Sequence, residues 1–197
     1  MTNGICIEGP YGEASPVGKY NNALLLTAGS GVPGIINHAM KLASREKPQN
    51  IKFIWIQKHF KDLNCYFDEC LNSLQNSRVI IDIYLTREES LEGANLASGV
   101  SGDSTGSSDE ASLSKKEKGV TKTHDTSTLP SFINFKLGRP DMEELIKKEV
   151  EGFGGGSVGI VACGPPIMMD RLRHAVSKEV SSYTAGRIDY FDEFQTW

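Results

Sequence analysis

The segment Ser157–Leu172, "SVGIVACGPPIMMDRL", is the feature that most constrains how this chain can fold. An apolar run ends at Cys163, and the two prolines that follow Gly164 can continue neither a strand nor the interior of a helix. A helix-like run comes next. The segment therefore predicts a buried strand, a forced corner and a helix. In open α/β sheets, a corner at the carboxyl end of a strand is where ligands bind.

Strand and helix patterns alternate along the chain before this segment. Apolar or β-branched runs at residues 22–30, 51–57 and 78–86 predict buried strands. The segments 34–47 and 63–74 place apolar residues at helical spacing and predict helices. This order implies parallel strands joined by right-handed crossovers. The predicted fold is therefore α/β, an open doubly wound parallel sheet.

One long segment breaks this alternation. Residues 93–128 are rich in Ser, Thr, Gly and mixed charges, and no aromatic residue occurs between Tyr84 and Phe132. Such a composition buries too little apolar surface to offset its ordering entropy, so we predict a disordered surface insertion. It could host phosphorylation, but a tolerated loop expansion is the simpler interpretation. A short strand, a helix capped by Asp141 or by the preceding turn, and a terminal strand complete the predicted elements.

Composition excludes several classes of function. A net charge of −4 in 197 residues argues against a nucleic-acid surface or a polybasic membrane patch. No apolar run approaches the roughly 20 residues that span a bilayer, and the N-terminus lacks the features of a signal peptide. The four cysteines form no CxxC pair and no metal-ligand pattern with the four histidines. We therefore expect no metal site, no transmembrane segment and reduced thiols.

A glycine-rich loop between the first predicted strand and helix is the second candidate site. Its sequence "GSGVPG" fits G-x-G-x-x-G, which lets backbone amides approach a pyrophosphate at a helix N-terminus. Proline suits the first helical turn, where its missing N–H is not needed. A tight turn without a ligand is the alternative. The candidate cofactor-binding residues are Thr27, Gly29, Ser30, Gly31, Val32, Pro33 and Gly34.

The end of the second strand favours one form of nicotinamide cofactor. An NAD-specific site places a carboxylate there to bond the ribose 2′-OH, but this strand ends in "WIQKHF", with Gln57 and Lys58. A cation suits a 2′-phosphate, so the composition favours NADP(H), although Lys58 could also be a solvated surface residue. Arg139 is a second candidate phosphate contact, although Gly-Arg-Pro more often marks a turn.

The two candidate sites are expected to lie side by side. The first strand and the strand of Ser157–Leu172 are neighbours in the common doubly wound order, so their carboxyl ends flank one crevice. A lone Cys163 would more often be a small buried hydrophobe. In combination with the glycine loop, Cys163, Gly164, Pro165 and Pro166 form the strongest signal in the chain.

Five motifs in this order carry a family resemblance. They are "EGPYG" (8–12), "LLLTAGSGVPG" (24–34), "GRP" (138–140), "CGPPIMM" (163–169) and "DYFDEFQTW" (189–197). Their order and spacing resemble the Rossmann-like NADP-binding module of the ferredoxin–NADP reductase superfamily. The residues within these motifs are similar to those of fungal ferric/cupric-chelate reductases, which are relatives of the NADPH oxidases.

The resemblance implies roles for individual residues. The loop Gly29–Gly34 would bind the NADPH pyrophosphate, and Cys163 would lie beside the nicotinamide and the flavin, where hydride passes. Gly164, Pro165 and Pro166 would shape that pocket. Trp197 would stack on the flavin and give way when nicotinamide docks, unless it is an edge-strand aromatic packed on the core. Gly9, Pro10, Tyr11 and Gly12 would form the hinge out of a flavin domain, near the cofactor.

The domain organisation follows from the same resemblance. Residues 1–20 would be the last strand and hinge of a flavin domain, and residues 21–197 the NADP-binding domain. The FAD-binding motif and haem ligands of such reductases lie upstream of "EGPYG" and are not in this sequence. The chain would be a fragment, a truncated gene product, or a chain that completes the flavin half of another protein. Alone, it should not reduce iron.

The expected function is the C-terminal NADPH-binding part of a ferric/cupric-chelate reductase. Hydride would pass from NADPH to FAD, and electrons then to haem and external metal. The expected partners are NADPH and a flavin/haem half, in cis or in trans. The site would lie on the cytosolic face of the plasma or vacuolar membrane, while the chain alone would be soluble and cytoplasmic. The alternatives are a superoxide-forming NADPH oxidase, a silent nucleotide- or partner-binding module and an ordinary dehydrogenase.

Overall fold

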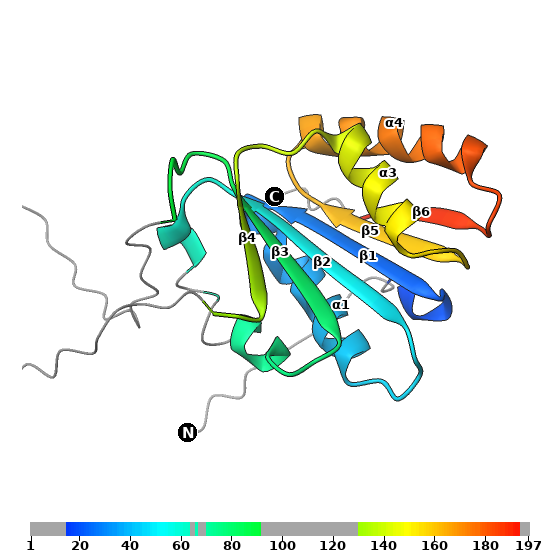
Figure 1. Cartoon of the computed structure of the whole chain (residues 1–197), viewed down its shortest axis with the longest axis horizontal. Coiled ribbons are helices and arrows are strands. Elements are labelled where there is room, and N and C mark those ends of the chain that lie inside the picture. Colours follow the sequence, from blue (N-terminus) through cyan, green and yellow to red (C-terminus); the bar gives the residue numbers. More distant parts are fainter. Residues whose placement is uncertain (1–14, 64–65, 67–69, 92–129, 194–197) are drawn as a thin grey trace, which may run out of the picture.

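A six-stranded, entirely parallel sheet forms the centre of the computed structural model (Figure 1). The structure describes residues 15–63, 66, 70–91 and 130–193. The strand order is β4-β3-β2-β1-β5-β6, which confirms the predicted open α/β sheet. The strands are β1 (Asn22–Ala28), β2 (Asn50–Gln57), β3 (Val79–Leu85), β4 (Ile133–Leu137), β5 (Val158–Cys163) and β6 (Ile188–Asp192).

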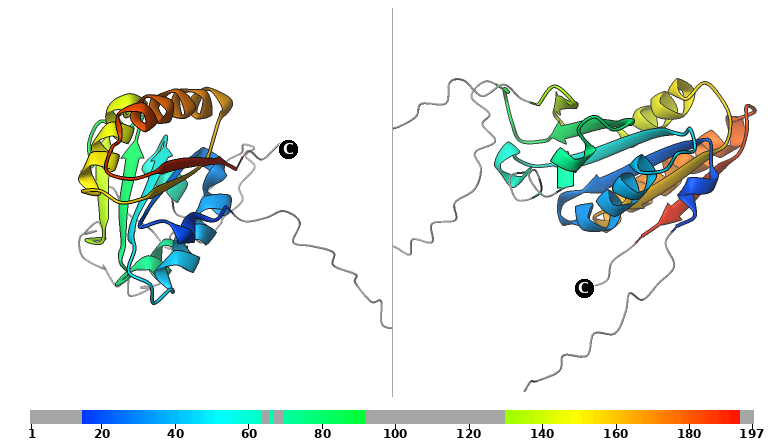
Figure 2. Two further views of the ribbon diagram at one scale, coloured as in Figure 1. Left: turned by 90° about the vertical axis from the view of Figure 1, so that its right-hand side faces the viewer. Right: turned by 90° about the horizontal axis from the view of Figure 1, so that it is seen from below.

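Helices cover both faces of the sheet. Figures 1 and 2 show α1 (Val32–Ala43) on one face and α3 (Met142–Gly152) and α4 (Pro166–Ser182) on the other. Successive side chains of a strand point to opposite faces, so Leu25 packs in the core beneath α1, and its neighbours in the core beneath α3 and α4. A strand buried on both faces reads as a continuous apolar run, as "ALLL" does.

The predicted helix at 63–74 is only partly described. Its described residues include the end of a 3-10 helix, Phe60–Leu63, and all of a second one, Asn72–Leu74. Leu63, Leu71 and Leu74 are buried, as their spacing predicted.

Several predictions lie outside the described residues. These are the insertion at 93–128, the hinge residues Gly9, Pro10, Tyr11 and Gly12, and Trp197. The boundary at residue 20 also stays a prediction. Among the residues just before it, Val17–Lys19 form a 3-10 helix whose Val17 is buried in the same core as Leu25.

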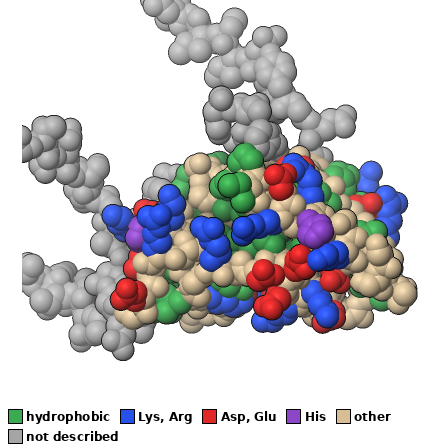
Figure 3. Space-filling view, turned by 90° about the horizontal axis from the view of Figure 1, so that it is seen from above, with side chains coloured by type: hydrophobic (Ala, Val, Ile, Leu, Met, Phe, Trp, Pro, Cys, Tyr) green, Lys and Arg blue, Asp and Glu red, His purple; other side chains and the backbone are tan. Residues whose placement is uncertain are grey.

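The helices beyond the strands begin where the sequence predicts. The Asp141 carboxylate accepts hydrogen bonds from the amides of Glu143 (2.9 Å) and Glu144 (3.1 Å) and so caps α3. α4 begins at Pro166, directly after the corner. Over α3 and α4, basic and acidic side chains lie side by side (Figure 3), as in the pair of Lys178 with Glu143. No helix in the described part of the chain combines the length and apolar character needed to cross a bilayer.

A buried carboxylate organises the outer part of the sheet. Asp82 of β3 is only 1% exposed and contacts the ammonium groups of Lys52 (2.8 Å) and Lys136. The Asn134 amide donates a third hydrogen bond, at 3.0 Å. Burial raises the pKa of Asp82, but the hydrogen bonds from Lys136, Lys52 and Asn134 outweigh it and hold the pKa below 3.8. The ionised form of Asp82 is therefore the stable one in the folded chain.

Asp82→Asn would remove the buried counter-charge of Lys136 and leave Lys52 with only the Glu149 carboxylate, 4.0 Å from its ammonium group. We expect the free energy of unfolding at neutral pH to fall by about 2 kcal/mol or more, as measured by urea denaturation.

The effect should depend on pH in a defined direction. A carboxylate whose pKa is lower in the folded chain stabilises it fully above the ordinary pKa of 3.8, and this stabilisation is lost as pH falls. The difference between wild type and Asp82→Asn should therefore shrink between about pH 4 and about pH 2. Asp170→Asn, at an exposed pair with Arg173, is the control and should change stability little. A pH-independent difference would contradict the assignment.

Candidate functional site

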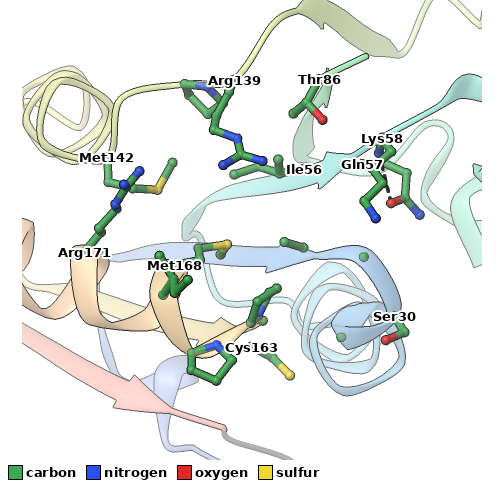
Figure 4. Close-up of a pocket in the computed structure, with 18 of the residues that line it drawn as sticks. Ser30, Ile56, Gln57, Lys58, Thr86, Arg139, Met142, Cys163, Met168 and Arg171 are labelled. Atoms are coloured by element: carbon green, nitrogen blue, oxygen red, sulfur yellow. Dashed lines mark hydrogen bonds between the residues drawn. The ribbon is translucent and has the colours of Figure 1, made fainter. Parts of the chain in front are cut away.

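The carboxyl ends of the strands surround a cavity of about 770 Å³ (Figure 4). Every strand from β1 to β5 sends its following turn to this edge, because all of them run in the same direction. The cavity is lined by Ala28, Gly29, Ser30, Gly31, Ile56, Gln57, Lys58, Asp62, Thr86, Arg139, Pro140, Met142, Cys163, Gly164, Pro165, Pro166, Ile167, Met168 and Arg171.

The glycine loop and the corner are in direct contact. β1 pairs with β5 in a register that sets Thr27 opposite Cys163, so the two strands end together. A Cβ on Gly31 would lie 2.9 Å from the Cys163 carbonyl oxygen and 3.0 Å from its Sγ, too close for any side chain. A glycine is therefore required at position 31, because a side chain there would collide with the corner at Cys163.

Gly29 is a glycine for a different reason. Its φ is 56°, in the left-handed region, while a Cβ there would meet nothing within 4 Å. Its carbonyl oxygen accepts a hydrogen bond of 3.3 Å from Nε1 of the fully buried Trp55. The loop is therefore shaped by its own backbone and held in place from the core below.

Nine of the predicted site residues line the cavity together. They are Gly29, Ser30, Gly31, Lys58, Arg139, Cys163, Gly164, Pro165 and Pro166. Four others do not line it. Thr27 and Val32 are fully buried, and the Thr27 hydroxyl has no hydrogen-bond partner among the described residues. Pro33 and Gly34 lie in the first turn of α1. The binding roles of all these residues stay predictions.

Positive charge predominates around the cavity. Lys58, Arg139 and Arg171 line it, against the single carboxylate of Asp62. Figure 4 shows the two arginines on either side of Met142, with Lys58 across the cavity. α1, α3 and α4 all begin at this edge, and the N-terminal ends of helices favour anions. The arrangement suits a ligand with more than one phosphate.

Sequence reasoning missed several lining residues. Arg171 lies on α4, a little more than one helical turn after Pro166, so helical spacing from the corner could have found it. Asp62 lies in the 3-10 helix after β2, where its carboxylate accepts a hydrogen bond of 3.3 Å from the His59 amide. Thr86 follows β3, and nothing in its local sequence distinguishes it.

The corner after β5 gives the cavity an apolar wall. Cys163 is only 4% exposed, although it borders the cavity. A Cβ on Gly164 would lie 3.2 Å from Sδ of Met168, so these residues pack closely. The described residues contain no cluster of His, Cys, Asp or Glu that could hold a metal ion.

Comparison with known proteins decides the family. Residues 20–177 match the ferric reductase NAD-binding domain. The chain belongs to this family. The match confirms the predicted resemblance and supports a nicotinamide cofactor.

Curated relatives agree with this assignment. The chain is 38% identical over 201 residues to "Ferric/cupric reductase transmembrane component 2" of Saccharomyces cerevisiae, covering 98% of the chain and 27% of the relative. It is 33% identical over 202 residues to "Ferric/cupric reductase transmembrane component 1" of Candida albicans, covering 98% of the chain and 25% of the relative. The chain therefore spans about a quarter of the length of these relatives.

Gly31→Ala tests the contact between loop and corner. The added Cβ must displace backbone, because it would lie 2.9 Å from the Cys163 carbonyl oxygen. We expect a loss of about 1–3 kcal/mol in the free energy of unfolding. We also expect binding of a nicotinamide nucleotide, followed by calorimetry, to weaken by about tenfold or more.

Gly152→Ala is the matched control. Gly152 ends α3, and a Cβ there would meet nothing within 4 Å. This variant should bind nucleotide as the wild type does and be no less stable. If Gly31→Ala behaved like Gly152→Ala, the loop would tolerate a side chain and the contact would not be a constraint.

Proposed function

We propose that this chain is the NADPH-binding part of a ferric/cupric-chelate reductase that delivers hydride to FAD. The observation that carries the proposal is that the glycine loop and the corner at Cys163 line one cavity together with three cationic side chains, Lys58, Arg139 and Arg171. Membership of the ferric reductase NAD-binding domain family supports it. The names of the relatives, which are ferric or ferric/cupric reductase components, support the substrate class.

The described residues fit a dinucleotide. The volume of about 770 Å³ lies within the range of cofactor cavities. The loop Gly29–Gly31 has no side chain at its closest approach to the corner, and α1 begins directly after it. We assign the pyrophosphate to this loop, where backbone amides and the helix N-terminus favour negative charge.

Lys58 is our candidate for recognising the 2′-phosphate. It follows the last residue of β2, the position from which a ribose contact is expected. The Gln57 side chain accepts a hydrogen bond of 3.1 Å from the Lys58 amide, while the Lys58 side chain borders the cavity. Asp62 is the only lining carboxylate among the described residues, and three cations oppose it. This balance of charge favours NADPH over NADH.

The corner at Cys163 is our candidate for the nicotinamide end. NADPH would supply the hydride there, and FAD held by a flavin half would accept it. The role of the chain is to orient the nicotinamide against the apolar wall of Cys163 and Met168 and to exclude water. Such a transfer needs no general base from the protein.

The flavin side of the proposal rests on the resemblance alone. The predicted hinge near the cofactor (Gly9, Pro10, Tyr11 and Gly12) and the predicted flavin-stacking Trp197 lie outside the described residues. Transfer onward to haem and to external iron or copper, and a place on the cytosolic face of the plasma or vacuolar membrane, belong to the same proposal.

Lys58→Ala tests cofactor preference. We expect NADPH binding to weaken by about 10- to 100-fold, because a charge-assisted contact to phosphate is lost, while NADH binding stays nearly unchanged. Calorimetric titration with each nucleotide measures both. Lys61→Ala, at an exposed lysine nearby that does not line the cavity, is the control and should change neither.

Two further experiments test the role of the arginines and the alternative of a catalytically silent module. Arg139→Ala and Arg171→Ala should weaken the binding of NADPH and NADH alike, because we assign both arginines to phosphates that the two nucleotides share, across the cavity from Lys58 (Figure 4). Absence of binding of either nucleotide to the wild type would overturn the proposed function. Adding FAD and NADPH to the purified chain tests for a silent module, since bleaching of the flavin would exclude it.

A further inference from the structure

The turn after β2 is hydrogen-bonded to the turn after β3. The Thr86 amide donates to the Gln57 carbonyl oxygen at 2.9 Å, and the Arg87 amide donates to the Lys58 carbonyl oxygen at 3.0 Å. Thr86 and Arg87 lie past the end of β3, so the backbone contact continues beyond the paired strands. Figure 4 shows Thr86 and Lys58 on these neighbouring turns at the cavity. The backbone of Lys58 is therefore held from the side of β3.

The side chain of Glu88 adds a further contact between the two turns. Its Oε1 accepts a hydrogen bond of 2.9 Å from the Phe60 amide and lies 3.4 Å from Nδ1 of His59. A carboxylate that accepts from a backbone amide makes a charge-assisted bond, which is stronger than a neutral one. The Glu88 side chain is 30% exposed, so protein covers most of it. Glu88 is not one of the residues that line the cavity.

Phe60 fixes the far end of the turn after β2. Its side chain is 6% exposed in the core beneath α1, and its ring centroid lies 5.4 Å from that of Phe135. Lys58 lies only two residues before this buried ring. Because the Lys58 carbonyl and the Phe60 amide are both bound to the turn after β3, the short segment between them has little conformational freedom.

We propose that Glu88 is a positioning residue for cofactor preference, because it holds the turn that presents Lys58 to the cavity. The inference rests on the proposed function, in which Lys58 binds the 2′-phosphate of NADPH. A cation on a preorganised turn binds phosphate more tightly, since less conformational freedom is lost on binding. Glu88 thus favours NADPH over NADH without contacting either nucleotide.

Electrostatics alone predicts an effect of the opposite sign. Glu88 is a negative charge close to the site of an anionic ligand. If its removal left the turn unchanged, NADPH should bind more tightly, because one repulsion is lost. If Glu88 positions Lys58, its removal should weaken NADPH binding instead. The direction of the change therefore separates positioning from a simple charge effect.

The test is a calorimetric titration of the full chain and its variants with NADPH and with NADH. Glu88→Ala should weaken NADPH binding by about three- to tenfold and leave NADH binding nearly unchanged, because the turn that carries Lys58 is released. Glu88→Gln keeps an oxygen that can accept from the Phe60 amide and should restore most of the affinity for NADPH. In the Lys58→Ala background, Glu88→Ala should change neither constant further. Thermal unfolding shows that each variant is folded.

Glu89→Ala is the matched control. Glu89 is the exposed neighbour of Glu88 and carries the same charge. Its removal changes the net charge by the same amount but leaves the contact between Glu88 and Phe60 in place. NADPH should therefore bind this variant as it binds the wild type, or slightly more tightly.

The possible failures are distinguishable. Unchanged or tighter NADPH binding in Glu88→Ala, beside the expected loss in Lys58→Ala, would overturn the inference and leave the proposed function intact. Equal weakening of NADPH and NADH, or an absence of rescue in Glu88→Gln, would also overturn the inference alone. An unchanged NADPH constant in Lys58→Ala would overturn the assignment of the 2′-phosphate and the inference with it. A wild-type chain that binds neither nucleotide would overturn the proposed function as a whole.

Discussion

The site depends on the pairing of β1 with β5. That register brings the strand that enters the glycine loop and the strand that ends in the corner to the same level, with Thr27 opposite Cys163. The turns after them then meet so closely that Gly31 has no room for a side chain. Because the strands are parallel, the turns after β2, β3 and β4 lie along the same edge as this contact. The cavity is therefore a consequence of strand order more than of any single side chain.

The two faces of the sheet support this edge by different means. Apolar cores fill the space beneath α1 and beneath α3 and α4, and Trp55 reaches from the first core to hold the glycine loop. At the β3–β4 side, Ile81, Ile83 and Ile133 pack in the first core. On this side the ammonium groups of Lys52 and Lys136 also contact the buried Asp82 carboxylate. Charge pairing thus stabilises the part of the sheet farthest from the corner.

Most of the fold could be predicted from sequence because its signals are local. Apolar runs fixed the strands, and Asp141 and Pro166 marked where helices begin. The glycine loop and the corner could be predicted for the same reason, because the glycines and prolines that determine each turn are adjacent in the sequence. Arg171 was missed although helical spacing from Pro166 points to it, whereas the place of Asp62 depends on the course of the chain beyond the turn. The hydrogen bond from the Ser15 hydroxyl to the Glu193 carboxylate could not be predicted, because these two residues are 178 positions apart and meet only in the folded sheet.

The position of the Ser-rich segment bears on how such a domain can diversify. The chain leaves the sheet at Thr86, on the cavity edge, and re-enters at Ile133 to pair with Ile81 of the neighbouring strand. The entropy of closing a loop grows only slowly with its length, by about 0.6 kcal/mol per doubling. Extra residues between these two points therefore leave strand register and core unchanged. Evolution can lengthen the chain here at little cost to the fold, between Thr86 beside the cavity and Ile133 at the opposite edge of the parallel sheet.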